Sequence, residues 1–222
     1  MAKLKITEST SSYLSQLTVT TLGVEGNPIG NIGVRRFLPS LSQLQFLDIR
    51  QTGITVEGLE PLLGLKWMTA LHAINLSHIV GILCKLTTLR ELKLKQSLVT
   101  SEGLCQLLRS LTRLSSLDLA QNHISDEGLI YLSYLSHLTY LSLEKNGITC
   151  TGVGNSLCLL TNLRSLNHNG NVIEAQGVVT KLINLNITEV GIPQFCYRAA
   201  VVGYLTHLKR LQRINGHMIC DT

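Results

Sequence analysis

Aromatic residues make up only 5% of this 222-residue chain, and no run of 18 uninterrupted apolar residues occurs. We therefore expect no membrane-spanning helix. Residues 1–20 lack a long apolar core, which disfavours a secretory signal. The net charge is +5, but Lys and Arg are scattered and form no basic stripe of the kind that nucleic acids bind. These absences leave one substantial domain with a core of repeated aliphatic side chains, and they disfavour a nucleic-acid partner.

Sequence signatures of catalysis are also missing. The six cysteines form no C-x-x-C pair, so we expect free thiols rather than a disulfide framework or a zinc site. No P-loop, G-x-S-x-G, H-E-x-x-H or glycine-rich dinucleotide turn occurs, and the seven histidines are dispersed. We expect no enzymatic activity, no cofactor and no metal ion.

One pattern occurs twice, 24 residues apart, between Leu111 and Gly152. It reads Leu-x-x-Leu-x-x-Leu-x-Leu-x-x-Asn-x-Ile-x-x-x-Gly. Weaker copies begin at Val19, Leu44, Leu89 and Leu163. Alternating leucines predict a short strand whose leucines point inward, and the Gly-Leu half predicts a helix that closes the core. The Asn amide is expected to bond backbone groups of its turn and of the neighbouring unit.

This pattern resembles the leucine-rich repeat family, in particular its ribonuclease-inhibitor-like and bacterial GALA-type branches. The resemblance covers residues 19–187 and implies an α/β solenoid, with parallel strands on a concave face and helices or 3-10 turns on a convex face. We divide the chain into a cap or lead-in at 1–18, repeats at 19–190 and a C-terminal cap at 191–222. The last segment resembles the cap of small intracellular eukaryotic members, which implies a cytoplasmic or nuclear location.

Three details of the repeats are open to direct comparison with a structure. The third repeat is expected to start at Leu71 and to be short, leaving an irregular convex surface at residues 78–85. Ser or Thr before the Glu-Gly pairs should cap the helices. Leu117, Leu141 and Leu166 should be buried, and His168, in an inward leucine position, should bond neighbours such as Asn167 or Asn169.

The residues between the inward leucines should face the concave side. Phe46, Arg50 and Tyr140 are the expected anchors, because aromatic residues and Arg dominate interface hot spots. In the third repeat, Ala73 and Asn75 are expected to face the concave side. The candidate protein-binding residues are Phe46, Asp48, Arg50, Asn75, Glu91, Lys93, Lys95, Asp118, Tyr140, Ser142, Glu144 and Asn167.

The favoured function is a non-enzymatic adaptor, a monomer that binds a protein partner on its concave face. Preformed strands hold side chains in fixed register, so little ordering entropy is lost on binding. Two alternatives stay open. One is a regulatory subunit, either an inhibitor or a substrate receptor of a partner enzyme, and the other is an RNA-associated scaffold.

Overall fold

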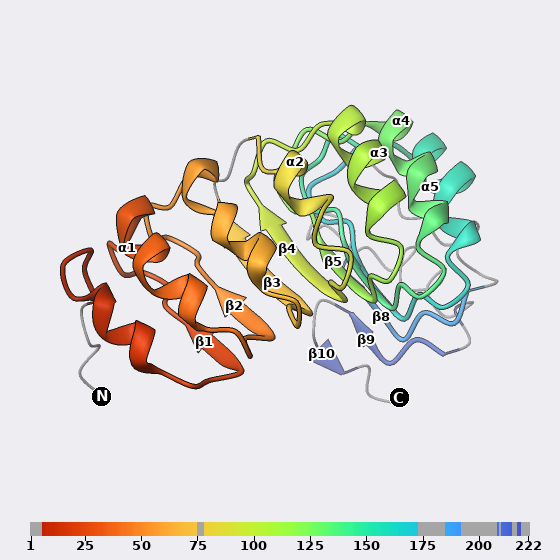
Figure 1. Ribbon diagram of the computed structural model, residues 1–222. Coiled ribbons are helices and arrows are strands. Elements are labelled where there is room, and N and C mark those ends of the chain that lie inside the picture. The colour runs from red at the N-terminus through yellow and green to blue at the C-terminus, as the bar shows by residue number, and fades with distance from the viewer. Residues whose placement is uncertain are drawn as a thin grey trace.

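The computed structural model describes residues 6–74, 78–172, 185–191, 208, 210–214 and 217–218. These residues form an α/β solenoid with one ten-stranded sheet whose strands follow chain order (Figure 1). Strands β1 to β9 are parallel, and β10 is antiparallel to β9. The strands are β1 Thr21–Gly23, β2 Phe46–Asp48, β3 Ala70–Ile74, β4 Glu91–Lys95, β5 Ser116–Asp118, β6 Tyr140–Ser142, β7 Ser165–Asn167, β8 Glu189–Gly191, β9 Arg213–Ile214 and β10 His217–Met218.

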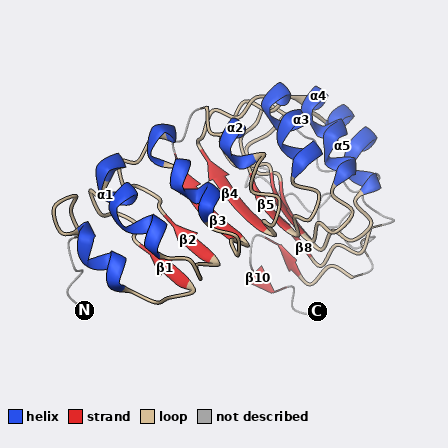
Figure 2. Cartoon of the chain, in the orientation of Figure 1, coloured by secondary structure: helices blue, strands red, loops and turns tan. Residues whose placement is uncertain are grey.

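Helices and 3-10 helices cover one side of this sheet, and its other side is open (Figure 2). The helices are α1 Gly30–Phe37, α2 Val80–Leu83, α3 Ser101–Ser110, α4 Asp126–Leu129 and α5 Cys150–Ser156. The 3-10 helices are η1 Ser11–Gln16, η2 Leu38–Ser40, η3 Val56–Gly58, η4 Glu60–Gly64, η5 Ile130–Tyr134 and η6 Leu157–Leu159. Strands stack about 4.8 Å apart, whereas packed helices need roughly 8–10 Å, so the strands line the inner side of the arc.

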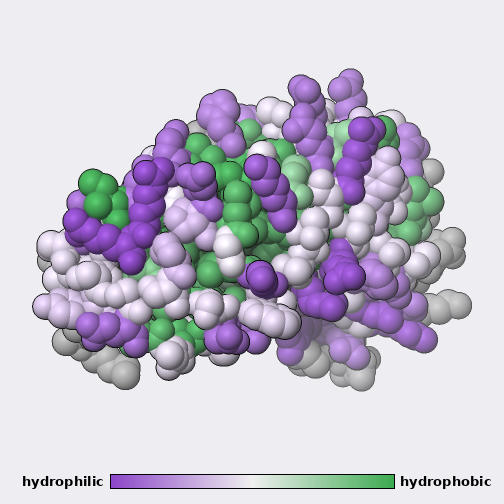
Figure 3. All heavy atoms as spheres, in the orientation of Figure 1, coloured by the Kyte–Doolittle hydropathy of each residue, from purple (hydrophilic) through white to green (hydrophobic). Residues whose placement is uncertain are grey.

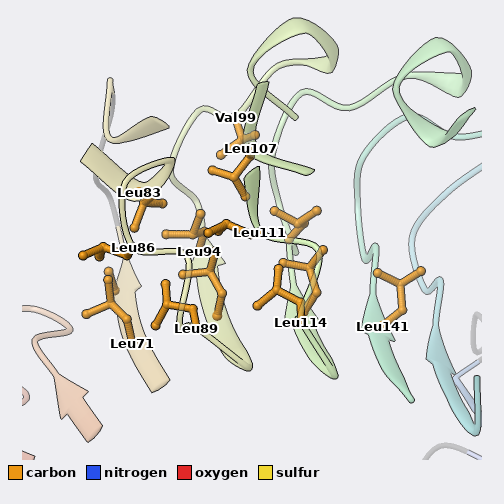
Figure 4. Packing of buried hydrophobic residues seen from close by; sticks show 14 of the residues in the cluster. Leu71, Leu83, Leu86, Leu89, Leu94, Val99, Leu107, Leu111, Leu114 and Leu141 are labelled. Carbon is orange, nitrogen blue, oxygen red and sulfur yellow. The ribbon is translucent and has the colours of Figure 1, made fainter. Parts of the chain in front are cut away.

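The core lies between the strands and the helices, and leucine fills most of it (Figure 4). Leu117, Leu141 and Leu166 stand side by side in backbone register on β5, β6 and β7. Their exposed fractions are 0%, 0% and 1%, which confirms their predicted burial. Each inward leucine therefore packs against its equivalent in the next repeat, and this packing ties the repeats into one core.

The asparagines that follow β5, β6 and β7 connect neighbouring repeats, as predicted. Asn122 accepts hydrogen bonds through Oδ1 from the backbone N–H groups of Ser97 (2.9 Å) and Val99 (3.0 Å). Its Nδ2 donates to the carbonyl of Leu94 at 2.8 Å. Asn171 repeats the arrangement towards the N–H of Asn146 at 2.8 Å. Buried main-chain groups of the turns after β4, β5 and β6 are thus satisfied by the following repeat.

The predicted register of the third repeat is wrong. Leu71 pairs with Leu47 and Leu92, not with the first leucine of their repeats, and that first position is held by buried Met68. The shift of three residues places Ala73 against Leu94, so Ala73 is fully buried instead of facing the open side. Side chains of β3 and its neighbours must fill one continuous core, and this packing decides the register. Asn75 lies outside the described residues.

The outer side is irregular where the prediction placed the irregularity. Here the repeat carries only the four-residue helix α2, where the next repeat carries the ten-residue helix α3. A pocket of about 370 Å³ lies between them, lined by residues that include Ile79, Leu98 and Gln106. Hydrophobic residues are visible near the middle of the molecule, around α2 (Figure 3).

Helix capping follows the prediction at Thr100, whose Oγ1 accepts from the N–H of Gly103 at 3.2 Å. At Thr55 and Ser125 no such side-chain cap forms. The backbone N–H groups of these two residues themselves bond to side chains of the preceding repeat. Asn31 Oδ1 accepts from the Thr55 N–H at 2.8 Å, and Ser101 Oγ accepts from the Ser125 N–H at 3.2 Å. The cap position is therefore a contact between repeats as well as a helix start.

His168 interrupts the column of inward leucines that Leu94, Leu119 and Leu143 form. Its side chain is 1% exposed. Neither ring nitrogen finds a hydrogen-bond partner within the described part of the chain, so the expected bonds to Asn167 or Asn169 are absent there. Burial lowers the pKa of His168 to about 4. The ring is therefore neutral near pH 7.

Candidate functional site

The open sheet face consists of the outward side chains of β1 to β9, and backbone pairing sets them in rows. Phe46, Glu91 and Tyr140 belong to one row. The second row passes through Asp48, His72, Lys93, Asp118, Ser142 and Asn167. Lys95 ends β4, and Arg50 and Glu144 follow β2 and β6. The structure thus brings the described candidate residues together on one face.

The first half of this face carries alternating charges that pair with one another. Arg50 contacts Glu25 at 2.9 Å and Asp48 at 2.6 Å. Nδ1 of His72 lies 3.7 Å from Asp48, and its Nε2 lies 2.7 Å from Oε1 of Glu91. We call this set the charge ladder, and it ends at Lys93, 3.1 Å from the same Glu91 oxygen. Its members are Glu25, Asp48, Arg50, His72, Glu91 and Lys93.

The ladder favours the ionised forms of Asp48 and Glu91. Burial alone would raise the pKa of Asp48, but hydrogen bonds and positive charge from Arg50, with a contribution from His72, outweigh burial and lower it. The pKa of Glu91 is lowered in the same way, because hydrogen bonds from His72 and Lys93 outweigh burial. The Arg50 pKa is raised, first by its hydrogen bond to Asp48. Each carboxylate of the ladder therefore has a basic partner.

Sequence reasoning missed His72, because the wrong register turned it away from this face. Its ring contacts Phe46 edge to face, with centroids 4.8 Å apart and an interplanar angle of 82°. If Met68 had been read as the equivalent of a leucine, the sequence would have given the correct register and placed His72 on this face. Asp48 and Ser142 are 7% and 2% exposed, so both lie on the face but beneath their neighbours.

The second half of the face holds a pocket of about 250 Å³, which we call the Tyr140 pocket. Asn167 Nδ2 donates to Glu144 at 3.3 Å, and its Oδ1 accepts from the backbone of Asn169 at 3.1 Å. Ser165 Oγ lies 3.5 Å from Glu189. Burial raises the pKa of Tyr140, and the negative charges of Asp118, Glu189 and Glu144 raise it further. The lining includes Tyr140, Ser165, Asn167, Asn169, Glu189 and Gly191.

No arrangement for metal binding is found among the described residues. No group of three or more His, Cys, Asp or Glu side chains there could hold a metal ion. Cys84, Cys105, Cys150 and Cys158 form no disulfide within the described residues, and no helix there is long and apolar enough to cross a membrane.

Comparison with known proteins agrees with this geometry. A family described as Leucine Rich repeat matches residues 110–133 and 134–154. The structure is similar to internalin C2 of Listeria monocytogenes str. 4b F2365, with a TM-score of 0.61 and 22% identity over 93% of this chain and 83% of that one. Internalin F of the same strain gives 0.57 and 21%, over 95% of this chain and 64% of that one. No curated protein matches the chain. The chain thus has the leucine-rich repeat solenoid fold, and residues 110–154 match the repeat family itself.

Proposed function

We propose that the chain is a non-enzymatic adaptor that binds a protein partner on the open sheet face. The observation that carries the proposal is the fixed order of that face. Eight parallel strand pairings hold the outward residues in two rows, and the charge ladder and the Phe46–His72 contact hold several side chains in place. A surface ordered before binding loses little entropy when a partner docks.

Among the described candidates, Tyr140 and Lys95 are suited to a direct test. Both are partly exposed, and neither belongs to the charge ladder, whereas a change at Arg50 would leave the buried Asp48 without its cation. Leaving a buried charge uncompensated destabilises a fold, so an Arg50 variant would confuse loss of binding with loss of structure. Tyr140 and Lys95 also lie on separate strands, β6 and β4, so a pair of changes samples a wide part of the face.

The experiment compares the wild type with the double variant Lys95→Glu, Tyr140→Ala in affinity capture from a native extract followed by mass spectrometry. The matched control is Lys66→Glu, Tyr134→Ala, which changes the same residue types at exposed positions in the segments between strands. We expect a partner that the wild type and the control retain and the double variant loses. A partner that all three proteins retain, with equal thermal unfolding, would contradict the proposal.

A further inference from the structure

We propose that the Tyr140 pocket receives an arginine side chain of the protein partner; this inference rests on the proposed function and names the chemistry of one contact within it. The pocket belongs to the described residues of β6, β7 and β8 and the turn that follows β7. Its shape, its hydrogen-bonding groups and its charge each point to such a guest.

The shape comes from a missing side chain. Gly191 occupies the position on β8 that Asn167 holds on β7 and Ser142 on β6. A Cβ atom at residue 191 would lie 2.6 Å from Oδ1 of Asn167, which is closer than such contacts allow. The hollow of about 250 Å³ is smaller than the roughly 300–1,000 Å³ of typical small-molecule sites. Its size therefore suits one inserted side chain.

The hydrogen-bonding groups of the pocket call for a donor. Oδ1 of Asn169 is buried and accepts no hydrogen bond from the residues that the structure describes, although buried polar atoms are rarely left unsatisfied. The Glu189 carboxylate, which has the Ser165 hydroxyl 3.5 Å away, can accept further hydrogen bonds. A guest that carries several N–H groups would satisfy these acceptors, whereas an anion or a carbonyl group would not.

The described lining of the pocket is negative. Asp118, Glu144 and Glu189 all act on Tyr140. Three basic residues lie around it: Lys93, in register with Asp118 and 3.1 Å from Glu91, Lys145, with its Nζ 3.9 Å from Glu144, and Arg213, in register with Glu189 on β9. None of them lines the pocket, whose described lining holds the Glu189 carboxylate and no Lys or Arg. A cationic guest is therefore favoured.

Arginine fits these three features together. Its planar guanidinium carries five N–H donors, pairs with a carboxylate through two parallel hydrogen bonds, and stacks on aromatic rings. Glu189 supplies the carboxylate, Asn169 the additional acceptor and Tyr140 the ring, all within the lining of one pocket. A lysine ammonium offers neither the planar fork nor the stacking surface.

The test is an NMR titration of the isotope-labelled full chain with N-acetyl-arginine amide, and in parallel with N-acetyl-citrulline amide, its neutral isostere. We expect saturable shifts at Asn169, Glu189 and Gly191 with the arginine compound and none with the citrulline compound. Glu189→Gln should weaken binding by about tenfold or more, as expected for loss of a charge-assisted hydrogen bond. The control Glu127→Gln, an exposed carboxylate on α4, should bind like the wild type.

Equal shifts with both compounds, absence of saturation, or unchanged affinity of Glu189→Gln would overturn this inference. Partner capture separates it from the proposed function. If Lys95→Glu, Tyr140→Ala loses the partner but Glu189→Gln captures it as well as the wild type, the open face binds and the pocket does not. If both variants capture the partner normally, the open face itself is excluded as the binding surface.

Discussion

Asn122 and Asn146 share one acceptor, because the side-chain amide of each donates a 2.8 Å hydrogen bond to the carbonyl oxygen of Leu119. One bond closes the turn of a single repeat, and the other crosses from the next repeat. The sharing makes the two repeats a single hydrogen-bonded unit, so disturbance of one amide should be felt in both.

Asn122→Ala should lower the free energy of unfolding by about 2–5 kcal/mol. The change removes the acceptor that the N–H groups of Ser97 and Val99 use, and a buried group left unsatisfied costs about 1–3 kcal/mol. Chemical denaturation checks the value. Asn155→Ala, at an exposed position of α5, serves as the control and should leave stability nearly unchanged. A loss below 1 kcal/mol at Asn122 would show that the amide connection is not stabilising.

Leu141→Ala should cost about 2–5 kcal/mol, because it empties part of a fully buried site between β5 and β7. Hydrogen exchange should also accelerate in the repeats on both sides, since each repeat is stabilised through its interfaces. Leu159→Ala, where the leucine is 57% exposed, is the matched control and should change stability by less than about 0.5 kcal/mol. Equal effects of the two variants would contradict the assigned core.

His168→Leu should stabilise the protein and reduce the pH dependence of its free energy of unfolding between pH 4 and 6.5. The folded-state pKa of about 4 lies below the unfolded value of 6.5, so in this range the unfolded chain binds more protons and stability falls as the pH falls. That loss is on the order of 3 kcal/mol across the window. Denaturation at several pH values measures it. The exposed His137→Leu should keep the wild-type slope, and a His168→Leu slope equal to that of the wild type would refute the prediction.

Gly152→Ala should destabilise the protein by about 1–3 kcal/mol, the usual cost of overpacking. A Cβ atom there would lie 2.2 Å from Oδ1 of Asp126, the atom that accepts the Thr149 N–H at 2.8 Å. Gly81→Ala in α2 meets no atom within 4 Å and should be neutral or slightly stabilising. Thermal unfolding of the two variants checks the contrast, and similar melting temperatures would argue against a steric role for the repeated glycine.

The sequence was sufficient to predict the architecture because the repeats share the same spacing of apolar residues. Leu117, Leu141 and Leu166 could be assigned to the core from spacing alone, since every strand alternates in the same sense. The predicted register of the third repeat was wrong because Met68 replaces a leucine there, and because Leu71 and Ile74 have the spacing of the first two leucines of a repeat. Only the packing of β3 between β2 and β4 decides that register.

The candidate site could be predicted only in part, because the burial of an outward residue depends on side chains from neighbouring strands. Asp48 is covered by its ladder partners, and Ser142 is buried on a strand that also presents the exposed edge of Tyr140. The Tyr140 pocket depends on Gly191, a residue without a side chain. A pattern of leucines gives no signal for it.

The two edge strands of the sheet affect whether copies of this molecule can associate end to end. A parallel stack could in principle grow into a fibre, with the first strand of one copy docking beside the last strand of another. Here β1 has three residues and ends in Gly23, while β10 has two and runs against the rest of the sheet. A docking copy would find a strand of opposite sense and few main-chain groups to bond. Short and reversed edges of this kind oppose end-to-end polymerisation.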